Sequence, residues 1–408
     1  MKRPHAALVV VLAGVSGALH VGKLPPALPI LQQELQVTLV QAGFLLSLVQ
    51  LAGMTLGLAM GAAADALGTR RTMVLGLVLL SVAGALGGLA TTPAMLLALR
   101  ACEGVGFLMA TLPAPALIRR LVEPQRLSAM LGMWGAYMPF GTAAGLLVGP
   151  AVIAATGWSG WWWLTAAFSL AMAAWLWLAV PELHDRRLAA PVAVGPGRVA
   201  RTLRAPGPWL VCLGFAAYSA QWLAVIGFLP TVYAQSGLPA VYAAPATALV
   251  AAVNMFGNIA SGRALQRGVP PAALLQAGYA AMAAGAILAF AAWTTADTTG
   301  VAIARYAGVL VFSALGGLIP ATMFWLAVRL APDEGSVSTT VGWVQQWSSL
   351  GQFAGPPLAA LVAARTGDWS STWCITGGFA LCGVVIASFI GRLARPGVGG
   401  SPPARPHS

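Results

Sequence analysis

Long apolar stretches alternate with short polar gaps along the whole chain. A helix that crosses the hydrocarbon core of a bilayer needs about 20 apolar residues. We predict twelve such helices, over residues 6–28, 40–62, 72–91, 95–118, 128–154, 161–181, 208–234, 241–263, 271–293, 299–328, 337–364 and 371–393. An even number of crossings returns the chain to the side on which it started. The predicted fold class is therefore an all-α membrane protein with twelve transmembrane helices and both termini on one side.

Composition supports the bilayer as the environment of this chain. Of its 408 residues, 59% are hydrophobic and 8% are charged, whereas soluble domains are about 25% charged. The net charge of +12 alone would fit a nucleic-acid-binding protein. However, the Lys and Arg residues lie on the side of the termini, with four exceptions: Lys23, Arg100, Arg305 and Arg365. Because cytoplasmic loops are enriched in Lys and Arg, we predict cytoplasmic termini and no nucleic-acid partner.

Residues that commonly bind metals or carry catalysis are few and scattered. The four cysteines lie inside apolar stretches and have no metal-ligand spacing. The four histidines are far apart, and the chain has neither a His-Glu-x-x-His motif nor an ATP-binding Gly-x-x-x-x-Gly-Lys-Ser/Thr loop. These features disfavour a membrane-embedded enzyme. We expect no enzymatic activity, no metal and no cofactor, and an ion gradient rather than ATP as the energy source.

The apolar pattern is interrupted near the middle of the chain by proline, glycine and arginine. We predict an N-terminal six-helix bundle over residues 1–181, a cytoplasmic linker over 182–207 and a C-terminal six-helix bundle over 208–395. The Pro-, Gly- and Ser-rich tail over 396–408 has the composition of a disordered segment.

The two predicted bundles resemble each other in sequence. Trp158-Ser159 recurs as Trp369-Ser370, Gly149-Pro150 recurs as Gly355-Pro356, and Arg100 recurs as Arg305. Chance could produce one such match, but several at nearly one separation indicate an internal duplication and two pseudo-symmetric halves. Glycines four residues apart, which allow close helix packing, also recur: Gly141 and Gly145 in one half, Gly351 and Gly355 in the other.

A short polar turn lies between the second and third predicted helices. Its carboxylate and arginines can tie two helix ends together through charge-assisted hydrogen bonds. The residues are Gly61, Asp65, Gly68, Arg70 and Arg71. Their spacing resembles the signature loop of the major facilitator superfamily, although Ala66 stands where that family often has a basic residue. The resemblance covers essentially the whole chain. It implies a gating loop here, two six-helix bundles in a bacterial inner membrane, and a solute site between the halves.

Two finer resemblances are weaker. The stretch from His20 to Pro29 is similar in overall texture, without a diagnostic motif, to the cyanate and nitroimidazole permease-like branch of the superfamily. Gly141, Gly145 and Gly149 resemble a motif that is frequent in exchangers, but the later paired glycines of that motif are missing. The direction of transport therefore stays open.

Ionisable residues inside membrane spans are costly and mark candidate functional sites. At about 1.5 Å of rise per helical residue, four cationic or protonatable side chains share a depth in the half of the bilayer away from the termini: His20, Lys23, Arg100 and Arg305. The resemblance implies that helices 1, 4, 7 and 10 line a central cavity. Helix 7 would contribute three residues at the matching depth: Tyr218, Gln221 and Trp222.

Positive charge in a cavity favours an anionic solute, and arginine can donate two parallel hydrogen bonds to an oxyanion. We predict that Arg100 and Arg305 form a solute clamp, one from each half. The alternative for Arg100 is a structural ion pair with Glu103, which lies on the same helix face. Lys23 can contact the solute or extend to the membrane surface. His20 titrates near neutral pH, so His20 and Glu103 are the candidates for proton coupling, and a structural role is the alternative for His20.

Together these features predict a monomeric secondary transporter, surrounded by lipid, that moves a small anionic solute by alternating access and is coupled to protons. Two alternatives stay open. If Glu103 or Asp65 dominates the charge of the cavity, the protein would export neutral or cationic drug-like compounds. A sensor that keeps the fold without transporting would also fit the sequence.

Overall fold

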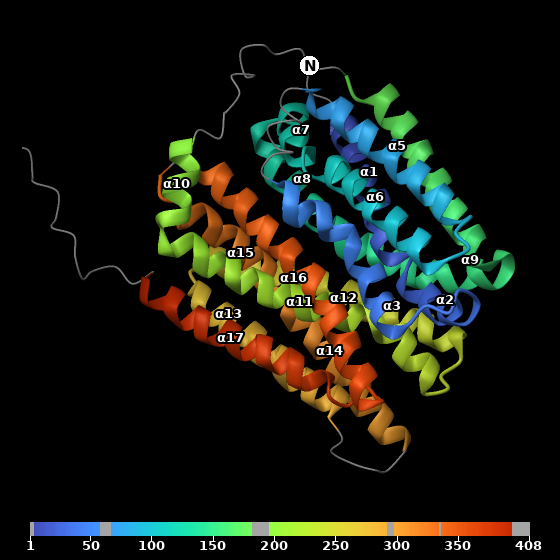
Figure 1. Ribbon diagram of the computed structural model, residues 1–408. Coiled ribbons are helices and arrows are strands. Elements are labelled where there is room, and N and C mark those ends of the chain that lie inside the picture. Colours follow the sequence, from blue (N-terminus) through green and yellow to red (C-terminus); the bar gives the residue numbers. More distant parts are fainter. Residues whose placement is uncertain (1–3, 58–66, 182–195, 292–297, 334–335, 394–408) are drawn as a thin grey trace, which may run out of the picture.

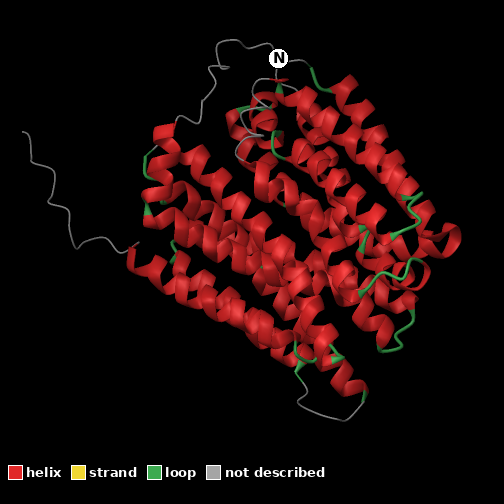
Figure 2. Ribbon diagram, in the orientation of Figure 1, coloured by secondary structure: helices red, strands yellow, loops and turns green. Residues whose placement is uncertain are grey.

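The structure is a computed structural model that describes residues 4–57, 67–181, 196–291, 298–333 and 336–393. Every regular element in these ranges is a helix (Figures 1 and 2). The N-terminal half contains α1 (Pro4–Gly22), η1 (Pro25–Ala27), α2 (Leu28–Glu34), α3 (Leu39–Ser47), η2 (Leu48–Gln50), α5 (Thr69–Gly87), α6 (Pro93–Thr111), α7 (Ala114–Leu121), α8 (Pro124–Gly135) and α9 (Tyr137–Ala179). The C-terminal half contains α10 (Pro196–Arg204), α11 (Pro206–Gln235), α12 (Ala240–Gln266), α13 (Pro271–Phe290), α14 (Thr299–Gly316), α15 (Leu318–Arg329), α16 (Val337–Thr366) and α17 (Thr372–Leu393).

Ten helices of the described part are long and apolar enough to cross a membrane. Two of the twelve predicted spans lie together in α9, whose 43 residues are interrupted at Gly157 by a left-handed turn with φ 74°. The predicted span at 337–364 corresponds to α16, which is as long as α11 but carries polar side chains in its middle, such as Gln345 and Gln352. The all-α membrane fold is confirmed, and the described residues of every predicted span are mainly helical.

Several predicted spans contain breaks that the apolar pattern does not show. The first helix ends at Gly22, because Pro25 and Pro26 follow and proline cannot continue an α-helix. The second contains the 3₁₀ turn η2, and the tenth is divided into α14 and α15 at Gly317. The division of the fourth span into α6 and α7 at Pro113 is the counterpart of the Gly317 break in the other half.

The two halves pack in the same way. Helix α1 lies against α9 as α11 lies against α16, and the pair α5–α6 corresponds to the pair α13–α14. Between the halves, α3 packs on α16 and α12 packs on α9. In Figure 1 the N-terminal half, blue to green, and the C-terminal half, yellow-green to red, lie side by side with their long helices running between the same two ends. The predicted pair of pseudo-symmetric bundles is therefore confirmed.

Glycines hold the main helix pair of each half together. A Cβ atom at Gly145 would lie 2.7 Å from the backbone of Gly22, and one at Gly355 would lie 2.1 Å from the carbonyl oxygen of Ala220. Real side chains cannot approach backbone atoms so closely, so only glycine allows these contacts. The predicted close packing at both sets of glycines is confirmed.

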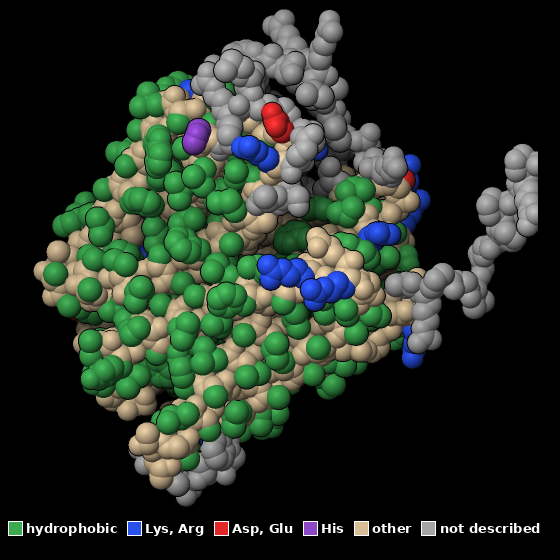
Figure 3. All heavy atoms as spheres, turned by 180° about the vertical axis from the view of Figure 1, so that it is seen from behind, with side chains coloured by type: hydrophobic (Ala, Val, Ile, Leu, Met, Phe, Trp, Pro, Cys, Tyr) green, Lys and Arg blue, Asp and Glu red, His purple; other side chains and the backbone are tan. Residues whose placement is uncertain are grey.

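An apolar cluster joins the halves at the end of the bundle opposite the termini, which we call the far side. It contains Leu24, Leu28, Leu45 and Leu46 from the N-terminal half, and Phe228, Ala360 and Trp369 from the C-terminal half. We call this cluster the far-side seal. The flanks of the molecule expose many large apolar side chains (Figure 3), as expected for surfaces that face lipid. In this conformation the far side is closed.

Candidate functional site

A buried carboxylate in the N-terminal half joins two cations. Glu103 Oε1 lies 2.5 Å from Lys23 Nζ, and Glu103 Oε2 lies 2.5 Å from Arg100 Nη1. Lys23 is completely buried, while Arg100 and Glu103 each expose 2% of their surface. The three residues come from the end of α1 and from α6, which the tertiary fold brings together.

His20 extends this network toward a pair of serines. Its Nδ1 lies 3.2 Å from Lys23 Nζ and 3.4 Å from Glu103 Oε1. Its Nε2 lies 2.9 Å from the hydroxyl of Ser169 on α9, which in turn lies 2.9 Å from the hydroxyl of Ser16 on α1. We refer to Ser16, His20, Lys23, Arg100, Glu103 and Ser169 as the charge network.

Local structure places each member of the charge network. Lys23 is the first residue after α1, and its amide still donates to Leu19 O. Its carbonyl accepts a hydrogen bond from Trp161 Nε1, and its ammonium group lies 4.8 Å from the ring centre of Trp162. Arg100 and Glu103 are three residues apart on α6 and therefore lie on one face of the helix. The Trp162 ring thus packs against the ammonium group, and no part of the Lys23 side chain is exposed.

The charges in this network do not cancel. One carboxylate serves two cations, and Arg100 Nη2 is buried without a hydrogen-bond partner in the described structure. Arg100 Nε donates to Leu45 O of α3 at 3.0 Å. Removing charges from water is expensive unless they are paired and hydrogen-bonded. A network with one uncancelled positive charge is therefore an expensive arrangement for a purely structural role.

Arg305 does not join Arg100. Arg305 is exposed on α14, whereas Arg100 is buried. It shares a helix face with Gly308 and Phe312, both of which pack against Gly285 of α13. The predicted depth is similar for both arginines, but their directions differ, so the structure does not bring together the predicted two-sided clamp. The role of Arg305 in transport stays a prediction.

The two halves differ in the residue that lies one helical turn after each arginine. The residue three positions after Arg100 is Glu103, whereas the residue three positions after Arg305 is Gly308. A Cβ at Gly308 would lie 2.7 Å from Gly285 O, so no carboxylate fits there. The charge network therefore exists in one half of the molecule, and the equivalent position of the other half is filled by a helix backbone.

The predicted residues of the seventh helix also lie inside their own half. The glycine contacts show which positions of α1 and α11 are equivalent in the two halves. Gly141 and Gly145 contact α1 as Gly351 and Gly355 contact α11. By this equivalence, His20 corresponds to Tyr218 and Lys23 corresponds to Gln221. The hydroxyl of Tyr218 hydrogen-bonds to Asn254, and Asn254 Nδ2 donates to Ser313 O. Trp222 Nε1 donates to Ser313 Oγ at 3.3 Å, and Gln221 Nε2 donates to Ala217 O. Neutral hydrogen bonds thus replace the charges of the N-terminal half.

Only part of the predicted gating loop can be placed. Gly61 and Asp65 lie outside the described residues. Gly68 has φ 91°, in the left-handed region that favours glycine, and caps the start of α5. Arg70 donates to Trp177 O at 2.5 Å and stacks over the Trp177 ring, so it joins α5 to α9. Arg71 is exposed in the first turn of α5. The latch between Asp65 and the arginines stays a prediction.

Two polar features of the structure are missing from the predicted site. Gln50 Nε2 donates to Gln352 Oε1 across the boundary between the halves at 3.0 Å. Ser169 and Ser16 bind each other and His20. A glutamine in the middle of an apolar stretch is a usable signal, because polar groups in lipid must find partners. Serine is too common in membrane helices to give such a signal.

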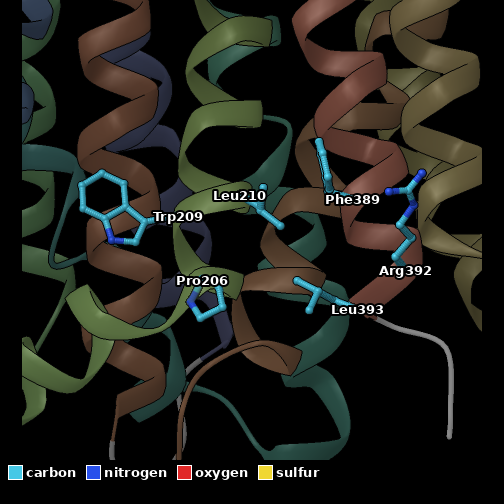
Figure 4. Close-up of a pocket in the computed structure, with 6 residues that line it drawn as sticks. All are labelled: Pro206, Trp209, Leu210, Phe389, Arg392 and Leu393. Atoms are coloured by element: carbon cyan, nitrogen blue, oxygen red, sulfur yellow. The ribbon is translucent and has the colours of Figure 1, made fainter. Parts of the chain in front are cut away.

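One pocket of about 610 Å³ lies between α11 and α17 (Figure 4). It is lined by Pro206, Trp209, Leu210, Phe389, Arg392 and Leu393. Both helices belong to the C-terminal half, so this pocket does not lie between the halves. In the part of the chain that the structure describes, no group of His, Cys, Asp and Glu residues could hold a metal ion.

Comparisons with known proteins agree with this fold. Residues 6–347 match the family model of the Major Facilitator Superfamily. Two crystal structures of a bacterial homologue of the human lysosomal transporter Spinster, both inward-facing, are similar at 17% sequence identity. The unoccupied form gives a TM-score of 0.68 over 95% of this chain and 94% of that chain. The occupied form gives 0.75 over 96% and 97%.

A likeness at 17% identity shows the fold alone. No curated protein sequence matches the chain. The family model, however, matches far more than half of its length. The chain therefore belongs to the major facilitator superfamily, and it is a multi-pass membrane transporter of the secondary type rather than an enzyme.

Proposed function

We propose that this protein moves a small anionic solute across a bacterial inner membrane and couples that movement to protons. The observation that carries the proposal is the buried carboxylate of Glu103, which is shared by Lys23 and Arg100. Alternating access needs no ATP-driven step, so the proposed source of free energy for uphill transport is a proton gradient. We further propose that both termini lie in the cytoplasm, as the distribution of Lys and Arg favours.

Proton coupling needs a group whose protonation changes the packing of helices. Protonation of Glu103 would weaken two ion pairs at once, one to α1 and one within α6. His20 of α1 lies between this carboxylate on α6 and Ser169 on α9, so it can pass a proton between α6 and α9. No other described carboxylate is buried to a comparable degree.

The proposed negative charge of the solute is based on the net positive charge of the charge network. Lys23 and Arg100 together carry one more positive charge than Glu103 cancels, and Arg100 Nη2 still has a hydrogen to donate. Arg305 adds an exposed guanidinium group on the other half. These groups favour an anion, and the proposed likeness to cyanate and nitroimidazole permease-like proteins would agree with a small one.

The conformation fits an inward-facing state if the termini are cytoplasmic. The far-side seal closes the end away from the termini, and the solved Spinster homologue structures are both inward-facing. The two halves already cover each other at α3–α16 and α9–α12. A monomer is therefore sufficient for alternating access.

A second function has a specific observation in its favour. Three indole rings, of Trp209, Trp343 and Trp347, lie edge to face with centres 5.4–6.0 Å apart on the C-terminal half. Trp134 and Tyr137 stack at 4.3 Å on the N-terminal half. Aromatic surfaces suit large apolar or cationic compounds, so export of drug-like molecules is the competing proposal.

Transport by purified protein in liposomes distinguishes these functions. Uptake of a panel of radiolabelled small carboxylates and inorganic oxyanions is measured with and without an imposed pH gradient. We expect accumulation of an anion that depends on the gradient. Gradient-driven movement of neutral or cationic dyes alone would support the competing proposal, and the absence of any flux would support a sensor.

Arg305→Ala is expected to lower anion uptake at least tenfold, if this exposed guanidinium group lies on the solute path. Loss of one charge-assisted hydrogen bond of about 1.5–3 kcal/mol corresponds to a change of that size. Arg365→Ala is the matched control, because Arg365 is also exposed and lies at the far end of α16 in the same half. Equal uptake by the two variants would remove Arg305 from the solute path.

A further inference from the structure

Two side-chain hydrogen bonds between described residues join the halves, and both lie where η2 and the residues that follow it meet α16. Gln50 Nε2 donates to Gln352 Oε1 at 3.0 Å, and Gln346 Nε2 donates to Met54 O at 2.6 Å. The first is the more deeply buried pair, with 2% and 9% of the two glutamines exposed. If the halves move apart here, the side-chain amides of Gln50 and Gln346 lose their hydrogen-bond acceptors. This contact therefore belongs to one conformation of the transport cycle.

The amide pair continues into the C-terminal half. Gln352 Nε2 lies 3.4 Å from Ser348 Oγ, one turn away on α16. Ser348 Oγ lies 2.7 Å from Ser219 Oγ on α11. Three elements, η2, α16 and α11, are thus connected through polar groups inside an otherwise apolar boundary.

The position of Gln50 depends on the 3₁₀ turn in which it lies. A 3₁₀ helix turns about 120° per residue and an α-helix about 100°, so three residues of 3₁₀ rotate the following chain by about 60°. If Leu48–Gln50 became α-helical, the side chain of Gln50 would turn away from Gln352 by roughly that angle. The turn therefore sets the direction in which Gln50 points.

Helix α6 holds this turn from the other side. Arg100 Nε donates to Leu45 O, one turn before η2. A Cβ at Gly104 would lie 2.9 Å from both Leu48 O and Val49 O, so the backbone of α6 supports η2 directly. In a 3₁₀ turn the i→i+4 pairing is replaced by i→i+3 pairing, and a carbonyl near the break can accept a hydrogen bond from another helix. Arg100 supplies that donor.

The same segment carries part of the far-side seal. Leu45 and Leu46 belong to the seal, and Leu46 lies over Gly227 of α11, where a Cβ would meet its side chain at 2.8 Å. Leu46, just before the 3₁₀ turn, and Gln50, at its end, therefore both contact the C-terminal half within one short stretch.

We propose that the Gln50–Gln352 bridge is a latch for the state in which the far side is closed, and that Arg100 is a positioning residue for this latch. Arg100 acts through Leu45 O and the 3₁₀ turn, whatever the solute and the coupling ion are. The latch stabilises the far-side-closed state against the far-side-open one. It can hold even if the proposed proton coupling or the proposed anion is incorrect.

The test measures the conformation and needs neither solute nor a pH gradient. The four native cysteines, Cys102, Cys212, Cys374 and Cys382, are replaced by alanine. Spin labels are attached at Thr91→Cys and Val241→Cys, exposed positions at the far ends of the two halves, and their distance distribution is recorded in nanodiscs. Gln50→Leu and Gln352→Leu are each expected to lower the ratio of closed to open protein at least about fivefold, the change that corresponds to a buried hydrogen bond.

A double variant separates a latch from general damage. Replacing both partners of a buried hydrogen bond leaves no unsatisfied amide, so Gln50→Leu with Gln352→Leu is expected to return part of the way toward the wild-type ratio. Gln276→Leu is the matched control, because Gln276 donates to Ser388 within the C-terminal half, and it is expected to leave the ratio unchanged. Single variants that behave like this control would overturn the latch.

Arg100→Lys tests the positioning role. Lysine keeps a positive charge beside Glu103 but cannot reach the carboxylate and Leu45 O with one planar group. We expect Arg100→Lys to shift the ratio as Gln50→Leu does, and to add nothing when the two are combined. A full additional shift in the combined variant would show that Arg100 acts by a separate route and would remove it from the latch.

Discussion

Glu103→Gln is expected to cost the protein about 3–5 kcal/mol of stability, because it leaves two buried cations without a counter-charge. Lys23 and Arg100 both use this carboxylate, at 2.5 Å each, and all three side chains are buried. The same change is expected to remove any dependence of transport on the pH gradient. Unfolding in mixed micelles and uptake into liposomes measure the two effects separately.

A compensating change identifies charge as the cause. Lys23→Met removes one of the unpaired cations, so Glu103→Gln combined with Lys23→Met is expected to be more stable than Glu103→Gln alone. Gradient-driven uptake is not expected to return, because the carboxylate is still missing. Glu123→Gln, at an exposed position, serves as the control and should leave stability unchanged. A double variant as unstable as the sum of its parts would contradict the account.

Gly355→Leu is expected to separate α11 from α16 and to destabilise the C-terminal half by at least about 1–3 kcal/mol, as overpacking does. The new Cβ would lie 2.1 Å from Ala220 O and 2.6 Å from its carbonyl carbon. Backbone atoms of a helix cannot move aside as the end of a side chain can, so the upper part of this range is expected. The measurement is the midpoint of thermal unfolding of the purified protein.

Gly378→Leu provides a control of identical chemistry. Gly378 also lies in a helix, α17, but no atom of a neighbouring element lies within 4 Å of the position of its Cβ. We expect Gly378→Leu to change the midpoint little. Equal loss for the two variants would mean that helix propensity, not the approach of α16 to α11, explains the effect.

The positions of the helices could be predicted from the sequence, whereas several of the breaks inside them could not. Each apolar stretch is long enough to identify a span, and prolines such as Pro25 and Pro113 give local reasons for two of the breaks. Nothing in Leu48-Val49-Gln50 disfavours an α-helix. That turn is set by tertiary contacts, namely Gly104 beneath its carbonyls and Arg100 at Leu45 O.

The sequence predicted at what level of the membrane the site residues lie, but not in which direction their side chains point. Helical rise correctly places His20, Lys23 and Arg100 at one level, and the structure brings them together around Glu103. Depth does not fix the rotation of a helix about its axis, which depends on which neighbours it packs against. Arg305 is exposed on α14, three residues before Gly308, which packs on α13, and it does not join the other three. The alternative of an ion pair between Arg100 and Glu103 is the one that the structure forms.

The far-side seal has an optical consequence. Four of the fifteen tryptophans of the chain lie in or beside it: Trp158, Trp161, Trp162 and Trp369. Two of their indole groups, those of Trp158 and Trp369, donate to the polar side chains Glu34 and Gln235 at its edge. Opening of this end would bring water to these rings and move their fluorescence emission to longer wavelength. With the remaining tryptophans replaced by phenylalanine, the protein would report its own gating by light, without an attached dye.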